Sequence, residues 1–237
     1  MKKIIVFDVS GEYAHFKKHY TTTSPLTFSF PPRTTICGLI AAIIGLKKDE
    51  YLNHFSKEKA QIALSIRNPI TKVRFSENLI DTKTAKMMSR IVNRTQIRFE
   101  FVKDPSYRIY FTHHDEQMYN RSLGIIEKNK SVYTPCLGLS EHIANIKFVG
   151  EMDYQKKSST QDFIPINSVL PFLDNSQMKI NYEVDKEYFT ETMPNEMTPT
   201  REVKEYLKII FERTGSTILL KEMDFWLLSN NERIIFL

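Results

Sequence analysis

The segment Pro32-Arg33-Thr34-Thr35 combines residue types that bind phosphate at the start of a helix. Prolines favour the position just before or inside a helix start, and an apolar repeat typical of a helix follows at 34–44. A helix N-terminus presents unpaired N–H groups, to which an arginine fork and threonine hydroxyls add donors. Arg33, Thr34 and Thr35 are therefore candidate phosphate ligands, with a plain helix start and a surface arginine as the alternative.

Basic residues are concentrated between residues 67 and 108, which carry 10 Lys and Arg against 4 Asp and Glu. Lys86, Arg90 and Arg94 recur at every fourth position and form one stripe if residues 83–94 are helical. Such a stripe can follow a phosphate backbone, although a solvated surface helix has the same pattern. Further candidates are Arg98 and Arg108, on the outward face of a hairpin predicted from 95–102 and 107–112. Lys17 and Lys18 lie in a polar loop after the first predicted strand.

Histidines supply the residues from which a nuclease centre could be built. His15, His19, His113 and His114 could act as general acids and bases in metal-independent RNA cleavage. The sequence does not bring them together, and packed or solvated histidines are the alternative. Cys37 and Cys136 form no CxxC pair, and no Walker, GxGxxG, HExxH or GxSxG motif is present. We therefore expect no catalytic residue, no metal and no cofactor.

The elements that must position these residues follow a ferredoxin-like (RRM-like) order. A strand is predicted at 2–9, a helix at 34–44 ended by Gly45, and a strand at 61–66. The hairpin, a helix at 115–127 and a strand at 143–151 follow. This β-α-β-β-α-β order predicts two helices on one face of a mixed four-stranded sheet. A short polar helix is also expected at 47–60.

The remainder of the chain reads as a second, smaller unit. A polar run at 155–160 follows the ferredoxin-like elements, and short strands are predicted at 162–171, 177–184, 216–221, 224–229 and 232–237. A helix is predicted at 201–213, with Thr200 as its N-cap. The predicted fold class is α+β, with a ferredoxin-like domain at 1–153, a thumb-like insertion at about 74–94, and a small β-rich domain at 154–237.

Charge is unevenly distributed along the 237 residues. Residues 1–150 carry 23 Lys and Arg against 13 Asp and Glu, whereas residues 151–237 carry 10 against 15. This asymmetry favours a polyanion at the first part and a basic protein neighbour at the second. No stretch reaches the roughly 18 apolar residues of a membrane span, and no signal peptide is recognisable. We therefore expect no membrane partner and a cytoplasmic location.

Two segments resemble the N-terminal signature of a known family. These are Asp8-Val9-Ser10-Gly11-Glu12-Tyr13-Ala14-His15-Phe16 and the run from Phe30-Pro31-Pro32-Arg33-Thr34-Thr35 to Gly45. They resemble the CRISPR-associated Cas-five proteins, RAMP-type subunits of type I Cascade complexes, and most of all the subtype I-B branch. The segment 135–140 is similar to that family as well, so the resemblance spans about residues 1–150.

The resemblance implies a non-catalytic subunit that binds and caps the 5′ handle of the CRISPR RNA (crRNA). It implies contacts with the Cas-seven backbone subunit and a Cas-eight-type large subunit, and an indirect relation to target DNA, in antiviral defence. One branch of the family, subtype I-C, cuts precursor crRNA itself. A metal-independent endoribonuclease centred on His15, His113 or His114 is therefore the alternative, and a scaffold acting through residues 151–237 is a third reading.

Overall fold

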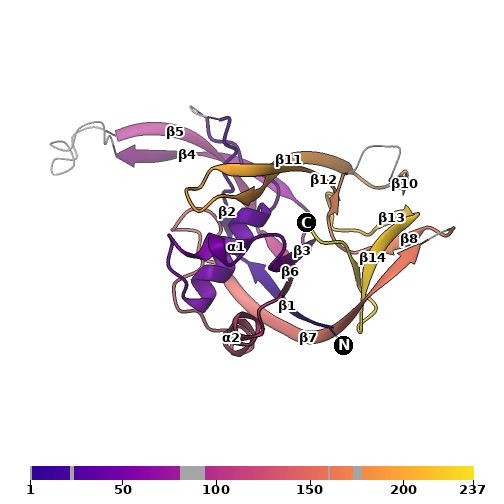
Figure 1. The fold of residues 1–237 in the computed structure, drawn as a ribbon. Helices are drawn as coiled ribbons and strands as arrows, with labels where there is room; N and C mark the ends of the chain where they lie inside the picture. Colours follow the sequence, from indigo (N-terminus) through magenta and orange to yellow (C-terminus); the bar gives the residue numbers. More distant parts are fainter. Residues whose placement is uncertain (1, 22–23, 81–93, 160, 173–177) are drawn as a thin grey trace.

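The structure, a computed structural model, describes residues 2–21, 24–80, 94–159, 161–172 and 178–237 (Figure 1). Its first strand, β1 (Lys2–Ser10), is apolar on both faces and lies inside a six-stranded sheet. It pairs with β6 (Ser106–His113) and β7 (Asn145–Ser159), while β3 (Ala60–Ile66) pairs with β6. The order β7-β1-β6-β3 confirms the ferredoxin-like prediction. Each of these pairings is antiparallel, because β1 and β3 run in one direction and β6 and β7 run in the other. The predicted mixed sheet was therefore wrong.

Two helices cover one face of this sheet, as predicted. Helix α1 (Arg33–Ile44) buries its apolar stripe against β1, and Gly45 ends it in the left-handed region at φ 76°. Helix α2 (Glu116–Ile126) begins at Asp115, whose side chain accepts a hydrogen bond from the Met118 N–H. The polar helix expected at 47–60 is only a 3-10 turn, η1 (Tyr51–Asn53), because that segment has few apolar residues to bury.

A two-stranded arm projects from the sheet (Figure 1). It consists of β4 (Thr71–Ile80) and β5 (Arg94–Lys103), and the short β2 (Tyr13–Ala14) adds to the base of β5. The predicted hairpin is therefore wrong: β5 pairs with β4 and β2, and β6 pairs within the main sheet. The turn at Asp104, with φ 48°, redirects the chain between two sheets. Arg94 belongs to a strand, whereas Lys86 and Arg90 lie outside the described residues.

The described C-terminal part is built from strands of two to ten residues. These are β8 (Ile164–Ile166), β9 (Leu170–Pro171), β10 (Lys179–Asn181), β11 (Tyr188–Met197), β12 (Val203–Glu212), β13 (Ile218–Lys221), β14 (Met223–Leu228) and β15 (Arg233–Ile234). Strand β12 replaces the helix predicted at 201–213, because Leu207, Ile209 and Phe211 alternate toward the core while pairing with β11. The domain division at 153/154 stays a prediction; β7 runs across it and pairs with β14. No helix among the described residues is long and apolar enough to cross a membrane.

Candidate nucleic-acid interface

Arg33 serves the fold rather than a ligand. Its side chain is 2% exposed, and its guanidinium donates to the backbone carbonyls of Ala60 (2.7 Å), Phe55 (3.1 Å) and Asn195 (3.3 Å). These bonds tie the start of α1 to the segment before β3 and to β11. Since the fork is committed to three carbonyls, Arg33 does not face a phosphate, contrary to the prediction from the sequence.

A groove of about 1000 Å³ runs along the exposed side of α1. Its floor includes Thr34 and Thr35, which the sequence singled out, and the small residues that follow them on the helix. No described side chain caps the first turn of α1, whose N-cap residue is Pro32. The walls come from three segments far apart in the sequence: Leu46–Tyr51, 133–138 and the turn between β11 and β12. The lining residues are Thr34, Thr35, Gly38, Leu39, Ala41, Ala42, Leu46, Lys47, Lys48, Asp49, Tyr51, Tyr133, Thr134, Cys136, Gly138, Met197 and Arg201.

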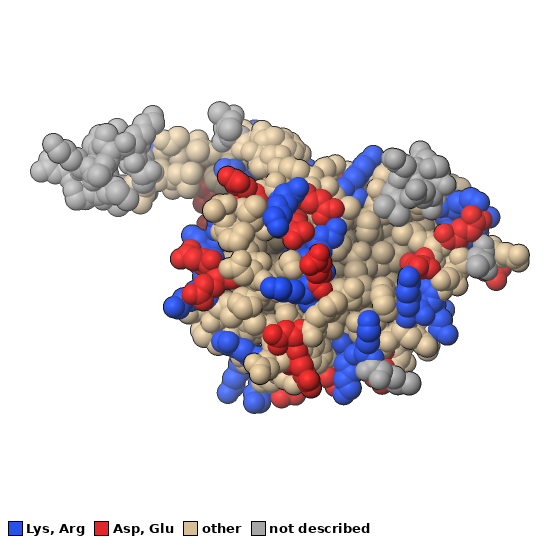
Figure 2. Space-filling view, viewed as in Figure 1, with Lys and Arg blue, Asp and Glu red and all other residues tan. Residues whose placement is uncertain are grey.

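The described lining of the groove carries three basic side chains, Lys47, Lys48 and Arg201, against one carboxylate, Asp49. Lys47 lies 4.0 Å from Glu50, but both are well exposed, so water and salt screen this pair. Basic and acidic side chains are interspersed on the face shown in Figure 2. The local excess of basic groups, more than the net charge of +5, therefore makes this groove suitable for a polyanion.

Aromatic rings lie beside these basic groups. The Arg201 guanidinium is 6.0 Å from the centre of the Tyr51 ring, and its Nη2 is 3.5 Å from the Lys48 carbonyl. Burial raises the pKa of Tyr51, so its hydroxyl stays neutral and able to donate a hydrogen bond. Tyr133, in the wall segment 133–138, is 52% exposed. Phosphates could bind to the basic groups while bases stack on these rings.

Sequence reasoning missed Lys47, Lys48, Tyr51, Tyr133 and Arg201. The pair Lys47-Lys48 directly after Gly45 was a readable signal, since these residues follow a helix whose start was already a candidate. Arg201 had no such signal. It reaches the groove only because β11 and β12 form a ribbon whose turn packs beside α1.

The two lysines of the first loop have different environments. Lys18 donates to Glu191 of β11 at 3.0 Å and is largely buried, so its charge is used within the protein. Lys17, one residue earlier, is exposed. Neither residue lines the α1 groove.

Three candidate arginines, Arg94, Arg98 and Arg108, lie in different parts of the fold. Arg94 and Arg98 are exposed on β5 and belong to the projecting arm. Arg108 lies on the sheet face away from the helices, where its guanidinium contacts Asp8 at 2.8 Å and Glu232 at 2.9 Å. Both carboxylates compensate its charge, so Arg108 is a structural residue rather than an RNA ligand.

The candidate histidines do not form one centre. His15 is buried, its Nδ1–H donates to the Glu100 carbonyl at 2.8 Å, and burial lowers its pKa. His113 Nε2–H donates to the His54 carbonyl at 2.8 Å, and its Nδ1 accepts from the Asp115 N–H. His19 contacts Tyr206 on the distant strand β12. His15 and His113 are therefore held by backbone groups.

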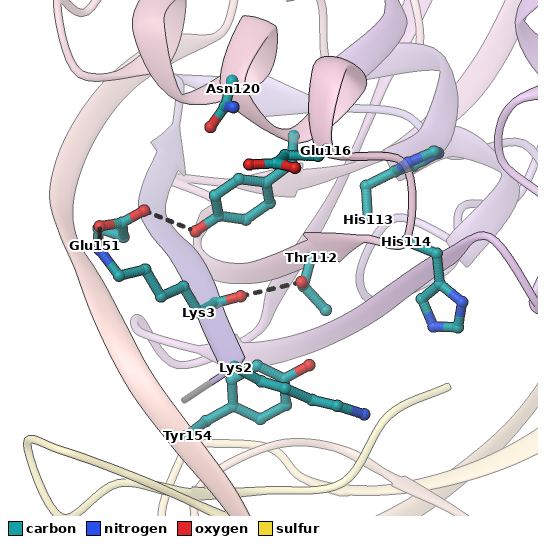
Figure 3. Close-up of a pocket in the computed structure, with 10 residues that line it drawn as sticks. Lys2, Lys3, Thr112, His113, His114, Glu116, Asn120, Glu151 and Tyr154 are labelled. Carbon is teal, nitrogen blue, oxygen red and sulfur yellow. Dashed lines mark hydrogen bonds and ion pairs between the residues drawn. The ribbon is translucent and has the colours of Figure 1, made fainter.

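His114 opens on a second pocket of about 670 Å³ (Figure 3). Lys2, Glu116 and Asn120 line the same pocket. Glu151, also in its wall, is engaged by Lys3 at 2.6 Å and by the Tyr119 hydroxyl at 3.0 Å. No group of three or more metal-ligating side chains occurs among the described residues. This pocket offers acid–base groups but a less basic surface than the α1 groove.

Comparisons with known proteins agree with this fold. Residues 4–121 match the family described as CRISPR-associated protein (Cas_Cas5). No curated protein matches the chain. A CRISPR protein from Archaeoglobus fulgidus has the same fold, with a TM-score of 0.57, 14% identity and 98% of each chain covered. A chain of a CRISPR RNA-guided surveillance complex is similar with a TM-score of 0.51, 9% identity, and 97% of this chain and 92% of that chain covered. Over residues 4–121, just under half of its length, this protein is therefore similar to the CRISPR-associated Cas-five family.

Proposed function

We propose that this chain is a non-catalytic subunit of a type I CRISPR surveillance complex, of subtype I-B, that binds the 5′ handle of the crRNA. The observation that carries the proposal is the α1 groove, where basic and aromatic side chains meet in a chain whose residues 4–121 match the Cas-five family. The fold shared with a chain of an RNA-guided complex supports it.

The groove accounts for the two parts of single-stranded RNA recognition. Lys47, Lys48 and Arg201 would hold phosphates, and the hydroxyls of Thr34 and Thr35 would add neutral donors. Tyr51 and Tyr133 would hold unpaired bases by stacking. Phosphate contacts of this kind make affinity depend on salt, whereas stacking does not.

The arm would act with the groove and with neighbouring subunits. Arg94 and Arg98 are exposed on β5 and would bind the first nucleotides of the guide. Lys86 and Arg90, assigned to the same basic stripe from the sequence, lie outside the described residues. Exposed apolar side chains on β4, namely Phe75, Leu79 and Ile80, fit a surface that another subunit covers. The neighbours would be the Cas-seven backbone subunit and the Cas-eight-type large subunit, with target DNA contacted indirectly.

The pocket at His114 supports one alternative, a metal-independent endoribonuclease that processes precursor crRNA. His114, Lys2 and Glu116 supply groups that could move protons at a 2′-hydroxyl (Figure 3). The larger and more basic α1 groove favours the binding function over this one.

One titration tests both functions. Purified protein is mixed with labelled repeat RNA in EDTA, and each mixture is measured by fluorescence anisotropy and on a denaturing gel. Salt-dependent binding without cleavage is the expected result. Cleavage at one site would instead favour the endoribonuclease, with His114→Ala as the first variant to examine. Absence of both binding and cleavage, even at low salt, would contradict both proposed functions.

A further inference from the structure

An exposed cluster of rings lies outside the α1 groove. The His19 ring centre is 5.1 Å from those of both Tyr20 and Tyr206. Tyr20 is 62% exposed and Tyr206 is 45% exposed. Two exposed tyrosine rings gathered around an exposed histidine offer flat faces on which a base can stack. We refer to His19, Tyr20 and Tyr206 as the ring cluster.

Basic side chains flank the ring cluster on both of its elements. On β12, Lys204, Tyr206 and Lys208 are two residues apart and exposed, so they share the outward face of the strand. In the first loop Lys17 and His19 are also exposed and two residues apart. Each element therefore places a ring next to lysines, which suits a ligand with both flat bases and negative charge.

Carboxylates close to the ring cluster are largely engaged by other lysines. Glu205, on the inward face of β12, is held by Lys57 at 2.9 Å. Glu191 of β11 is held by Lys18 at 3.0 Å. Among the described carboxylates, Glu196 approaches a flanking lysine, at 4.0 Å from Lys204, and that lysine is more than half exposed. The cluster thus keeps a basic character despite the acidic composition of the C-terminal part.

The cluster lies between the groove and the arm. Strand β12 begins just after the turn that brings Arg201 into the groove, and Tyr206 follows Arg201 by five positions, at most about 17 Å along an extended chain. On the other side, Glu191 contacts both Lys18 and Lys72, the latter at the base of the arm. Figure 1 shows the β11–β12 ribbon running past α1 toward the arm.

We propose that the ring cluster is a stacking platform for unpaired bases of the bound RNA as the strand leaves the α1 groove toward the arm. This inference rests on the proposed function and adds to it a second, charge-independent contact. Stacking on aromatic side chains tolerates any base, because every base has a π-face. The platform would therefore hold the strand without reading its sequence.

The test compares the full-length wild type with the double variant Tyr20→Ala/Tyr206→Ala. Binding of a short single-stranded RNA is measured by anisotropy over a range of salt concentrations, beside the same RNA with abasic positions. Removing the platform is expected to weaken binding of the intact RNA about fivefold or more, as for the loss of one stacked base. The salt dependence should stay the same, and affinity for the abasic RNA should hardly change.

The control is Tyr182→Ala, another exposed tyrosine, which neighbours Tyr188 in the C-terminal part. It should bind both RNAs like the wild type. Equal affinity of the double variant and the wild type for intact RNA would overturn the platform but leave RNA binding by the groove standing. Failure of the wild type to bind RNA would overturn both proposals. Unchanged RNA affinity together with weaker binding to partner subunits would overturn the platform and assign the cluster to a protein interface.

Discussion

The guanidinium of Arg33 in α1 and the backbone carbonyl of Asn195 in β11 are joined by a hydrogen bond of 3.3 Å. This bond links the first helix to the ribbon whose turn carries Arg201 into the groove. The arginine that looked most like a phosphate ligand in the sequence thus helps to form the groove from inside the protein.

Replacing Arg33 should therefore lower stability more than RNA affinity. Arg33→Lys keeps the charge but removes the fork, leaving buried carbonyls without donors, and should reduce the free energy of unfolding by about 3 kcal/mol. Urea denaturation measures this reduction. RNA affinity of the folded variant should stay near the wild-type value. Wild-type stability together with weakened RNA binding would contradict this prediction and indicate that Arg33 contacts the RNA.

Two glycines should respond to alanine in opposite directions. Gly138 has φ 99°, and a Cβ there would lie 1.9 Å from the His15 carbonyl oxygen, so Gly138→Ala should cost at least about 2 kcal/mol. Gly124, inside α2, has no described atom within 4 Å of a built Cβ. Gly124→Ala should raise the free energy of unfolding by about 0.5–1 kcal/mol, since alanine favours the helix. Denaturation curves that rank the two variants the other way would contradict this structure around the groove wall.

Stability should fall in mild acid because of buried histidines. Burial lowers the pKa of His15, and likewise that of His142, below the usual value of 6.5. Below pH 6.5 the unfolded chain takes up protons that the folded chain does not, so the free energy of unfolding decreases as pH falls. Above pH 6.5 these histidines bind equal numbers of protons in the two states, so they cause no pH dependence there. Urea denaturation at several pH values measures this slope.

His15→Phe keeps a ring beside Phe99 and Phe101 but cannot titrate, so its stability should depend less steeply on pH between 6.5 and 5. His142→Phe should act in the same direction. If both variants keep the wild-type slope, other groups cause the acid sensitivity.

Local patterns predicted the elements but not their partners. The apolar run of β1, the stripe of α1 and the acidic start of α2 each depend on neighbouring residues, so the ferredoxin-like order could be inferred. Strand β12 was taken for a helix because Val203–Glu212 carries both periodicities, and pairing with the unpredicted β11 decides between them. The hairpin error has the same origin, since alternation identifies a strand and not its neighbour.

The residues of the candidate site show the same difference between local signals and tertiary packing. Thr34 and Thr35 were found because a helix start is a local signal, and both line the groove. Arg108 and Lys18 looked available in the sequence, but Asp8 and Glu191, remote in the chain, neutralise them. Tyr133 and Arg201 were missed because only tertiary packing brings them to α1.

The central claim is that the α1 groove binds the RNA backbone, and the salt dependence of RNA affinity tests it most directly. The variant Lys47→Ala/Lys48→Ala/Arg201→Ala is compared with the wild type and with Lys128→Ala/Lys130→Ala, two exposed lysines outside the groove lining. The account predicts weaker binding by the groove variant and a slope of log affinity against log salt that is smaller by about 0.7 for each phosphate the variant no longer neutralises. The control should keep the wild-type slope. A groove variant with wild-type affinity and slope would contradict the account.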